Sequence, residues 1–289
     1  MINKATPPLF GNFADEETDL LTVSNLNVIF NKGVSKGKNQ ELHAVKDVSF
    51  SLGKNQVLGV VGESGCGKST VARSILQLQK PDSGDIKFNG SSITDIDKKE
   101  IRKEIQLIFQ DPLDALNPRM TVAQIIAEPL HNLASVLNEK LSAAQIEEKL
   151  HQVIAAIGLQ KAHLQRYPHE FSGGQCQRIG IARAMIVNPQ LLVCDEPVSA
   201  LDVSIQAQII NLLLDLKEQT KMGMIFISHD LNIVRQISDK IIVLYNGEIV
   251  ESGNAETIYQ NPQHEYTKKL LASIPLADPN LERERIENL

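Results

Sequence analysis

Residues 62–69, Gly-Glu-Ser-Gly-Cys-Gly-Lys-Ser, form a glycine-rich stretch of the kind that binds phosphate groups. The spacing fits G-x-x-x-x-G-K-[ST], and the stretch stands between the apolar run VLGVV and the predicted helix VARSILQL. Glycines let backbone N–H groups converge on phosphate oxygens, and the N-terminus of the helix adds a positive partial charge. We therefore expect Lys68 to bridge the β- and γ-phosphates of a nucleotide and Ser69 to offer its hydroxyl to Mg²⁺.

Two adjacent acidic residues end a second apolar run, LLVCDE at 191–196. Asp195 is expected to reach Mg²⁺ directly or through water. The carboxylate of Glu196 would orient an attacking water or accept its proton, in line with the γ-phosphate. The plainer interpretation, an acidic strand end that faces solvent, is weakened by the phosphate-binding loop in the same chain.

The stretch EFSGGQCQR at 170–178 raises a different question, because a predicted helix begins there with two adjacent glycines. Each glycine within a helix costs about 1 kcal/mol relative to alanine. Ser172 is a good helix cap, but a cap alone does not require Gly173 and Gly174 in the first turn.

Short apolar runs must hold these residues in place. The runs IQLIF (105–109), LLVCDE (191–196) and MIFISHD (224–230) are typical of buried parallel strands. Asn89-Gly90 and Asn246-Gly247 predict tight hairpin turns. Between about residues 113 and 178 the pattern becomes helical, and Ser142 with Gln145 predicts a capping box there.

Composition is that of an ordinary globular protein. The chain has 289 residues, of which 42% are hydrophobic and 22% charged, and its formal charge is −6, so no global basic field favours nucleic acid. The three cysteines form no CxxC pair and are expected to be reduced. No signal peptide and no stretch of roughly 18 apolar residues is visible, so we expect any membrane role to depend on other chains.

From about residue 21 onward, the motifs and their order resemble those of the ATP-binding cassette (ABC) ATPases. The motifs are the loop 62–69, Gln110, FSGGQ at 171–175, the pair Asp195-Glu196, SALD at 199–202, and His229. The resemblance implies an α/β fold, with a P-loop NTPase (RecA-like) core, an antiparallel β subdomain and an inserted α-helical subdomain at about 113–178. It also implies an ABC ATPase domain at 21–253 and a C-terminal extension at 254–289. Residues 1–20 are expected, from their polar composition, to be a mobile lead.

The resemblance explains the two glycines and assigns further roles. It implies that residues 172–175 form a second phosphate-binding helix N-terminus, which closes on ATP held by the opposite subunit of a head-to-tail dimer. Asp202 would lie at the dimer interface, and His229 would contact the γ-phosphate. Gln110 would touch Mg²⁺ or the attacking water and sense a membrane partner through its loop. Phe30 stands where the family often has a tyrosine stacked on adenine.

The expected ATP contacts are Phe30, Gly62, Glu63, Ser64, Gly65, Cys66, Gly67, Lys68, Ser69, Thr70, Gln110, Ser172, Gly173, Gly174, Gln175, Asp202 and His229. The expected catalytic residues are Glu196, His229, Gln110 and Lys68, and the expected Mg²⁺ ligands are Ser69, Gln110 and Asp195.

The C-terminal run NPQHEYTKKLLASIP (261–275) resembles an extension found in oligopeptide and dipeptide importers. Pro262, His264, Tyr266 and Thr267 match the pattern Pro-x-His-Pro-Tyr-Thr, but Glu265 replaces the second proline. Some members place a cysteine cluster here for an iron–sulphur centre. No cysteine follows Cys194, so we expect no such centre.

The resemblance implies a set of partners. We expect a second ABC ATPase subunit, two transmembrane permease subunits and, indirectly, an extracytoplasmic substrate-binding protein, with this chain peripheral on the cytoplasmic face of the cell (inner) membrane. A heterodimer of cassettes is favoured, but a homodimer stays open because both halves of the ATP site are present. No nucleic-acid partner is expected.

Three alternatives remain open. A soluble ABC ATPase that acts on DNA or ribosomes would be expected to have a basic face or a second cassette, and neither is visible in the sequence. An export cassette is commonly fused to membrane helices. Within the importer subfamily, nickel complexes, glutathione or antimicrobial peptides are alternative substrates to oligopeptides and dipeptides.

Overall fold

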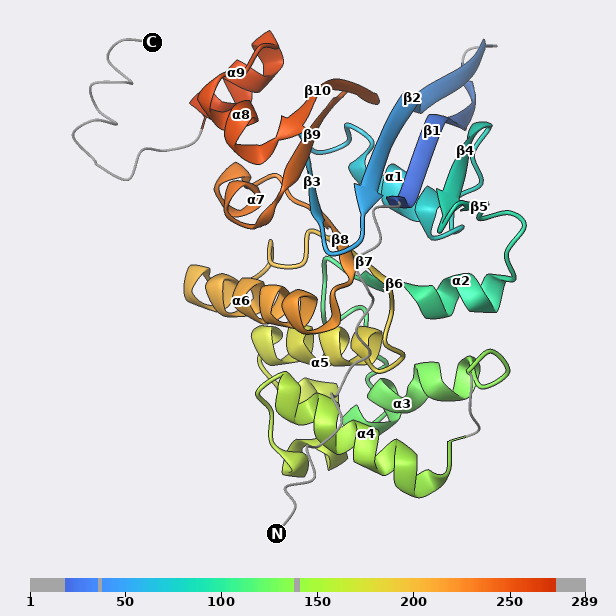
Figure 1. Cartoon of the computed structure of the whole chain (residues 1–289), viewed down its shortest axis with the longest axis vertical. Coiled ribbons are helices and arrows are strands. Elements are labelled where there is room, and N and C mark those ends of the chain that lie inside the picture. The colour runs from blue at the N-terminus through green and yellow to red at the C-terminus, as the bar shows by residue number, and fades with distance from the viewer. Residues whose placement is uncertain (1–18, 36–37, 138–140, 274–289) are drawn as a thin grey trace, which may run out of the picture.

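The computed structural model describes residues 19–35, 38–137 and 141–273. Figure 1 shows two β-sheets with a separate group of helices below them. Most of the predicted lead at 1–20 lies outside the described residues, and the extension predicted at 254–289 is described only as far as residue 273. The domain boundaries therefore remain predictions.

A six-stranded sheet at the centre carries the strands that precede the expected site residues. Its order is β10-β9-β3-β8-β7-β6, and only β10 runs antiparallel to its neighbour. The strands are β3 (Val57–Val61), β6 (Ile105–Ile108), β7 (Leu191–Asp195), β8 (Gly223–Ile227), β9 (Lys240–Tyr245) and β10 (Glu248–Asn254). The three strands predicted at 105–109, 191–196 and 224–230 are present. Because β6 and β8 end early, Gln110 and His229 stand in the loops beyond them.

A second, four-stranded sheet is antiparallel, with the order β2-β1-β4-β5. Its strands are β1 (Asp19–Ser35), β2 (Lys38–Gly53), β4 (Ser83–Phe88) and β5 (Ser91–Ser92). Both predicted hairpin turns form. Asn89 and Gly90 have φ angles of 48° and 79°, and Asn246 and Gly247 have 50° and 87°, as expected for two-residue turns of this kind.

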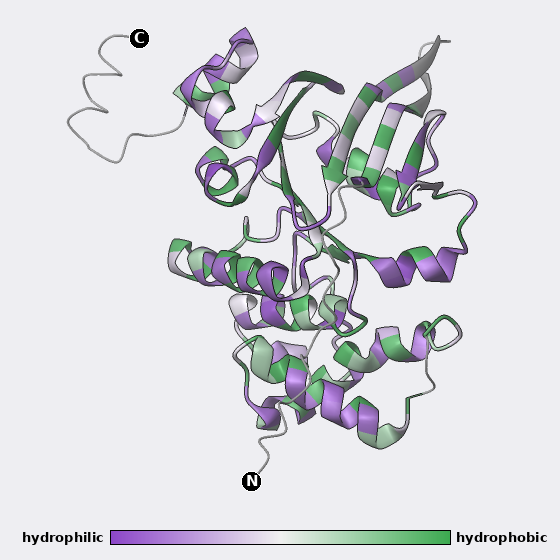
Figure 2. Ribbon diagram, in the orientation of Figure 1, coloured by the Kyte–Doolittle hydropathy of each residue, from purple (hydrophilic) through white to green (hydrophobic). Residues whose placement is uncertain are grey.

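The central sheet separates two hydrophobic cores. Alternate side chains of β3 divide between them, since Val57 and Val61 belong to one core and Leu58 and Val60 to the other. The first core includes residues of the helical group, and the second includes the four-stranded sheet (Figures 1 and 2). Burial on both faces explains why these strands read as continuous apolar runs in the sequence.

Helices pack around both sheets. Those near the sheets are α1 (Lys68–Ile75), α2 (Lys98–Glu104), α6 (Val203–Thr220), α7 (Leu231–Ile237), α8 (Ala255–Gln260) and α9 (Glu265–Ala272). The helical group contains α3 (Val122–Asn132), α4 (Ala143–Ala156), α5 (Gly173–Met185) and the short 3₁₀ turns η1 (Lys161–Gln165) and η2 (Pro168–Glu170). Ser142 and Gln145 form the predicted capping box of α4.

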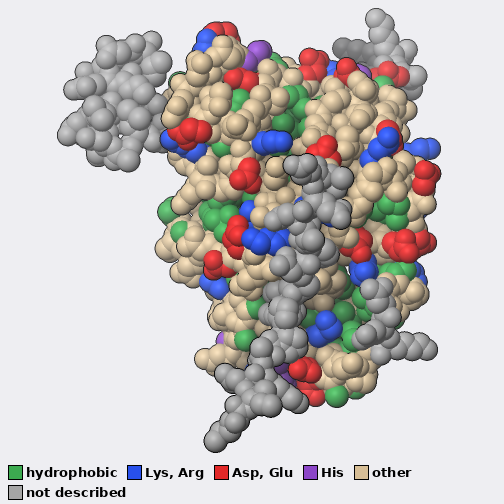
Figure 3. All heavy atoms as spheres, viewed as in Figure 1, with side chains coloured by type: hydrophobic (Ala, Val, Ile, Leu, Met, Phe, Trp, Pro, Cys, Tyr) green, Lys and Arg blue, Asp and Glu red, His purple; other side chains and the backbone are tan. Residues whose placement is uncertain are grey.

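The surface carries charges of both signs, interspersed over the face drawn in Figure 3. In the described ranges, no helix combines the length and apolar composition that a membrane crossing requires.

Packing explains one of the two glycines that begin α5. A Cβ atom at Gly174 would lie 2.4 Å from Cγ2 of Ile205 on α6, so the glycine allows the two helices to approach. A Cβ atom at Gly173 would lie 3.5 Å from the nearest atom, on Leu201, which is an ordinary contact. The fold therefore requires glycine at position 174 but not at position 173.

We predict that Gly174→Ala lowers the free energy of unfolding by about 1–3 kcal/mol, since the new methyl group overpacks the contact with Ile205. Gly180→Ala in the same helix is the matched control. A Cβ atom at Gly180 has no neighbour within 4 Å, so this change should stabilise the chain by up to about 1 kcal/mol. Urea unfolding measures both, and equal stabilisation by the two changes would contradict the tight contact.

Candidate functional site

The glycine-rich loop between β3 and α1 is wedged between the two sheets. A Cβ atom at Gly62 would lie 2.2 Å from the carbonyl oxygen of Leu244 on β9, and one at Gly67 would lie 2.5 Å from that of Ala44 on β2. The φ angles of Gly62 and Gly67, 151° and 111°, are also ones that other residues rarely adopt. Both positions therefore require glycine, and these close contacts restrict the backbone conformation of the loop.

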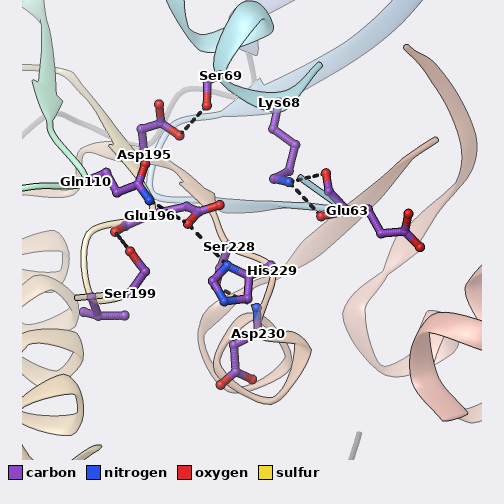
Figure 4. A network of polar contacts seen from close by, with 12 residues as sticks. Glu63, Lys68, Ser69, Gln110, Asp195, Glu196, Ser199, Ser228, His229 and Asp230 are labelled. Atoms are coloured by element: carbon purple, nitrogen blue, oxygen red, sulfur yellow. Dashed lines mark hydrogen bonds and ion pairs between the residues drawn. The ribbon is translucent and has the colours of Figure 1, made fainter. Parts of the chain in front are cut away.

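Lys68 lies buried at the start of α1. Its Nζ atom donates hydrogen bonds to the carbonyl oxygens of Gly62, at 2.7 Å, and Glu63, at 2.9 Å (Figure 4). The side chain thus folds back over the loop and holds its ammonium charge at the start of the loop. An ammonium in this place is available to phosphate oxygens that enter the loop.

Glu196 stands immediately after β7, with its carboxylate between two side chains from neighbouring loops. Its Oε2 atom lies 3.2 Å from Nε2 of Gln110 and 3.3 Å from Nδ1 of His229 (Figure 4). The structure therefore brings together three of the four residues predicted to be catalytic, from the ends of three parallel strands.

The backbone of Glu196 is unusual. Its φ angle of 49° is left-handed, which costs a non-glycine residue about 1 kcal/mol or more. The hydroxyl of Ser199 donates to the carbonyl oxygen of Glu196 at 3.1 Å. The N–H of Glu196 donates to the carbonyl oxygen of Ile227 at 3.0 Å. Ser199 thus supports the turn that aims the carboxylate. No feature of the sequence distinguished this role of Ser199.

Asp195 and Ser69 supply oxygen atoms beside the loop. The hydroxyl of Ser69 donates to Oδ1 of Asp195 at 3.0 Å. Burial raises the pKa of the Asp195 carboxyl, as does the nearby charge of Glu196, while the bond from Ser69 opposes that rise. A partly buried carboxylate and a hydroxyl suit a hard cation such as Mg²⁺. Among the described residues, no group of three or more His, Cys, Asp or Glu side chains is placed to hold a metal ion.

A cavity of about 380 Å³ joins part of the expected nucleotide contacts, while Gly62, Glu63, Cys66 and His229 do not line it. It is lined by Phe30, Leu42, Ala44, Ser64, Gly65, Gly67, Lys68, Ser69, Thr70, Gln110 and Glu196. One aromatic and two aliphatic side chains from the four-stranded sheet, Phe30, Leu42 and Ala44, thus share one cavity with the loop and with Glu196. Its volume is in the range of small-molecule sites.

The second expected phosphate site lies elsewhere. Residues 172–175 and Asp202 do not line this cavity. They begin α5 and α6, which pack on each other through Gly174, and the side chains of Ser172 and Asp202 are exposed. Ser172 caps α5 in a capping box with Gln175, and Asp202 makes no side-chain cap on α6. Ser172 and Asp202 thus lie exposed and away from this cavity, beside the half-buried residues 173–175.

Cys66, within the loop, is buried, and so are Cys176 and Cys194; all three are free thiols. Burial raises the pKa of the Cys66 thiol, and the nearby Lys68 only partly opposes this rise. Since the thiolate is the reactive form, Cys66 is shielded from alkylation in the fold.

We predict that iodoacetamide alkylates Cys66 slowly in the folded chain at pH 7.5 and rapidly after denaturation, because the thiol is buried and largely protonated. Once alkylated, Cys66 should block ATP binding, and bound ATP should slow the reaction further. Mass spectrometry of the tryptic peptides gives the rate at each cysteine. If the chain alkylated at Cys66 bound ATP normally, this placement of the nucleotide would be wrong.

Comparison with known proteins agrees with the family that the sequence motifs resemble. The family described as ABC transporter matches residues 45–199, and the oligopeptide/dipeptide transporter C-terminal region matches residues 250–289. The oligopeptide transport ATP-binding protein OppF of Haemophilus influenzae is 50% identical over 273 residues, which cover 92% of this chain and 81% of that protein. The dipeptide transport ATP-binding protein DppF of the same organism is 44% identical over 282 residues, covering 96% and 84%.

A solved structure of similar fold is a dimeric, post-hydrolysis state of an ATP-binding cassette bound to ADP and Pi. It has a TM-score of 0.70 and 27% identity, and the match covers 81% of this chain and 98% of that one. The predicted P-loop NTPase fold is confirmed. This chain therefore belongs to the ABC transporter family, among the ATP-binding proteins of oligopeptide and dipeptide transport.

Proposed function

We propose that the cavity between Phe30 and Glu196 is the site at which this chain hydrolyses ATP to power peptide uptake. The chain is an ATPase subunit of a peptide importer by its family. The observation that supports this site is the placement of Lys68 and Glu196 in one cavity, beside Ser69 and Gln110.

The contacts of Glu196 support its role as the residue that orients the attacking water. Gln110 and His229 both contact Oε2, so Oε1 is the oxygen that would accept a hydrogen bond from water. A carboxylate held in this way loses little freedom when the water binds. The ammonium of Lys68, which donates to the carbonyl oxygens of Gly62 and Glu63, would also donate to β- and γ-phosphate oxygens.

Ser69 and Asp195 would hold Mg²⁺, with Gln110 as a third oxygen donor, since the first two already lie within hydrogen-bonding distance. When bound, the cation would neutralise charge on the phosphates. Phe30 would stack on the adenine at the other end of the cavity, because a phenyl ring offers the same π face as a tyrosine.

The surface at Ser172, Gly173 and Asp202 supports pairing of two cassettes. A helix N-terminus binds phosphate through its free N–H groups, and fold packing does not require glycine at position 173. We propose that this surface closes on ATP held by a second cassette, in a heterodimer or a homodimer. The similar solved structure is also dimeric.

A larger cavity, of about 740 Å³, lies beside the ATP cavity and supports contact with a membrane partner. Gln110 lines both cavities, and the side chain of Phe109 is 45% exposed. We propose that a permease segment docks here and that Gln110 links this docking to ATP binding and hydrolysis in the neighbouring cavity. The chain would then lie on the cytoplasmic face of the membrane, below two permeases that receive peptide from an extracytoplasmic binding protein.

We predict that Glu196→Gln lowers kcat for ATP hydrolysis at least about 100-fold and leaves the Kd for ATP nearly unchanged, because the amide cannot accept a proton from water. A phosphate-release assay and a nucleotide titration give the two values. Glu218→Gln, an exposed change on α6, is the control and should behave as wild type. Near-normal turnover in Glu196→Gln would remove Glu196 from this role.

We also predict that the chain purifies from native membranes, in mild detergent, with two permease subunits and a second cassette. Mass spectrometry of the purified complex would identify them, and recovery of a peptide-binding protein would support peptide as the substrate. Recovery with ribosomal or DNA-bound proteins instead would contradict the transport partners and leave only the ATPase assignment.

A further inference from the structure

The C-terminal helix α9 contacts the nucleotide loop directly. The side-chain oxygen of Tyr266 accepts a hydrogen bond from the backbone N–H of Glu63 at 3.0 Å. Tyr266 is 8% exposed, although it lies more than 200 residues along the chain from the loop. This contact joins the C-terminal region to the first turn of the phosphate-binding loop.

The contact involves the same peptide group that Lys68 contacts. The carbonyl oxygen of Gly62 and the N–H of Glu63 belong to one planar peptide unit. Lys68 donates to the oxygen of that unit at 2.7 Å, and Tyr266 accepts from its nitrogen at 3.0 Å. Hydrogen bonds to both the C=O and the N–H of this peptide unit restrict its rotation about the adjacent backbone bonds. This matters here because glycine at position 62 allows more backbone conformations than other residues.

Tyr266 is itself held firmly. Its ring packs on the ring of Tyr245 with the centroids 4.2 Å apart, and its N–H donates to Nδ1 of His264. Gln263 and His264 immediately precede α9. Their N–H groups donate to the carboxylate of Glu251 on β10, at 2.7 Å and 3.1 Å. The hydroxyl therefore reaches the loop from a braced helix.

We propose that Tyr266 is a positioning residue for ATP binding, through which the C-terminal region sets the conformation of the phosphate-binding loop. This inference rests on the proposed ATP site. The bond from Glu63 favours one orientation of the Gly62–Glu63 peptide, with its carbonyl turned to Lys68. A loop that is ordered before ATP arrives loses less freedom on binding, and so binds more tightly.

The test compares Tyr266→Phe with Tyr245→Phe in the full chain. The first change removes the hydroxyl that contacts Glu63 and keeps the ring pair. The second removes the hydroxyl of the partner ring instead. We expect Tyr266→Phe to raise the Kd and the KM for ATP about threefold to tenfold, in line with the loss of one hydrogen bond, and to leave kcat unchanged. Tyr245→Phe should match wild type.

A purely structural role would lower the midpoint of thermal unfolding without nucleotide and leave the Kd of the folded protein unchanged. That result would overturn the inference, as would equal effects of the two changes or an unchanged or lower Kd in Tyr266→Phe. Lys68→Ala is the reference for the ATP site itself. If Lys68→Ala also bound ATP as wild type, the proposed site would fail, whereas loss of binding in Lys68→Ala alone would refute only the role of Tyr266.

A measurement on the unaltered chain is independent of any folding defect in the variants. The Glu63 amide should be protected from hydrogen exchange in the absence of nucleotide, because its N–H is bonded to Tyr266. Exchange at the rate of an unstructured amide would overturn the contact.

Discussion

The close approach of the glycine-rich loop to two strands is the constraint on which the site depends. Gly62 lies against the carbonyl oxygen of Leu244 in the central sheet, and Gly67 lies against that of Ala44 in the four-stranded sheet. The N–H of Gly247 also donates to the carbonyl oxygen of Cys66 at 3.0 Å. The loop is thus the place where the two sheets meet. For this reason a side chain of the four-stranded sheet can share a cavity with residues at the ends of the parallel strands.

The central, mainly parallel sheet positions the polar side chains of the site. Its strands end at one edge, so Gln110, Glu196 and His229 meet although they are far apart in sequence. The turn at Glu196 takes a left-handed conformation, and Ser199 and Ile227 hydrogen-bond to its backbone. A strained residue held by its surroundings gives a carboxylate with one orientation, which suits the activation of a single water.

Sequence patterns predicted the elements whose signals are local. The glycine spacing predicted the loop, and the Asn-Gly pairs predicted both hairpins, because each depends on the conformations of a few adjacent residues. The contact of Gly174 with Ile205, the support from Ser199 and the bond from Glu63 to Tyr266 were not predicted. They depend on distances between packed elements, which a local pattern does not contain. The motif that includes Tyr266 indicated a subfamily without indicating what its hydroxyl contacts.

The glycine-rich loop has neighbours on two sides that differ in how firmly they are held, and we infer that they have different roles. On one side Gln110 lines both the proposed ATP cavity and the larger cavity, in a loop that has an exposed phenylalanine beside it. On the other side Tyr266 reaches the loop from a helix braced by Glu251. An exposed loop can respond to a partner, whereas a braced tyrosine mainly restricts the backbone. Coupling to transport would then act through Gln110 on the water and the cation, and the C-terminal region would act on the affinity for ATP through the peptide group that it shares with Lys68.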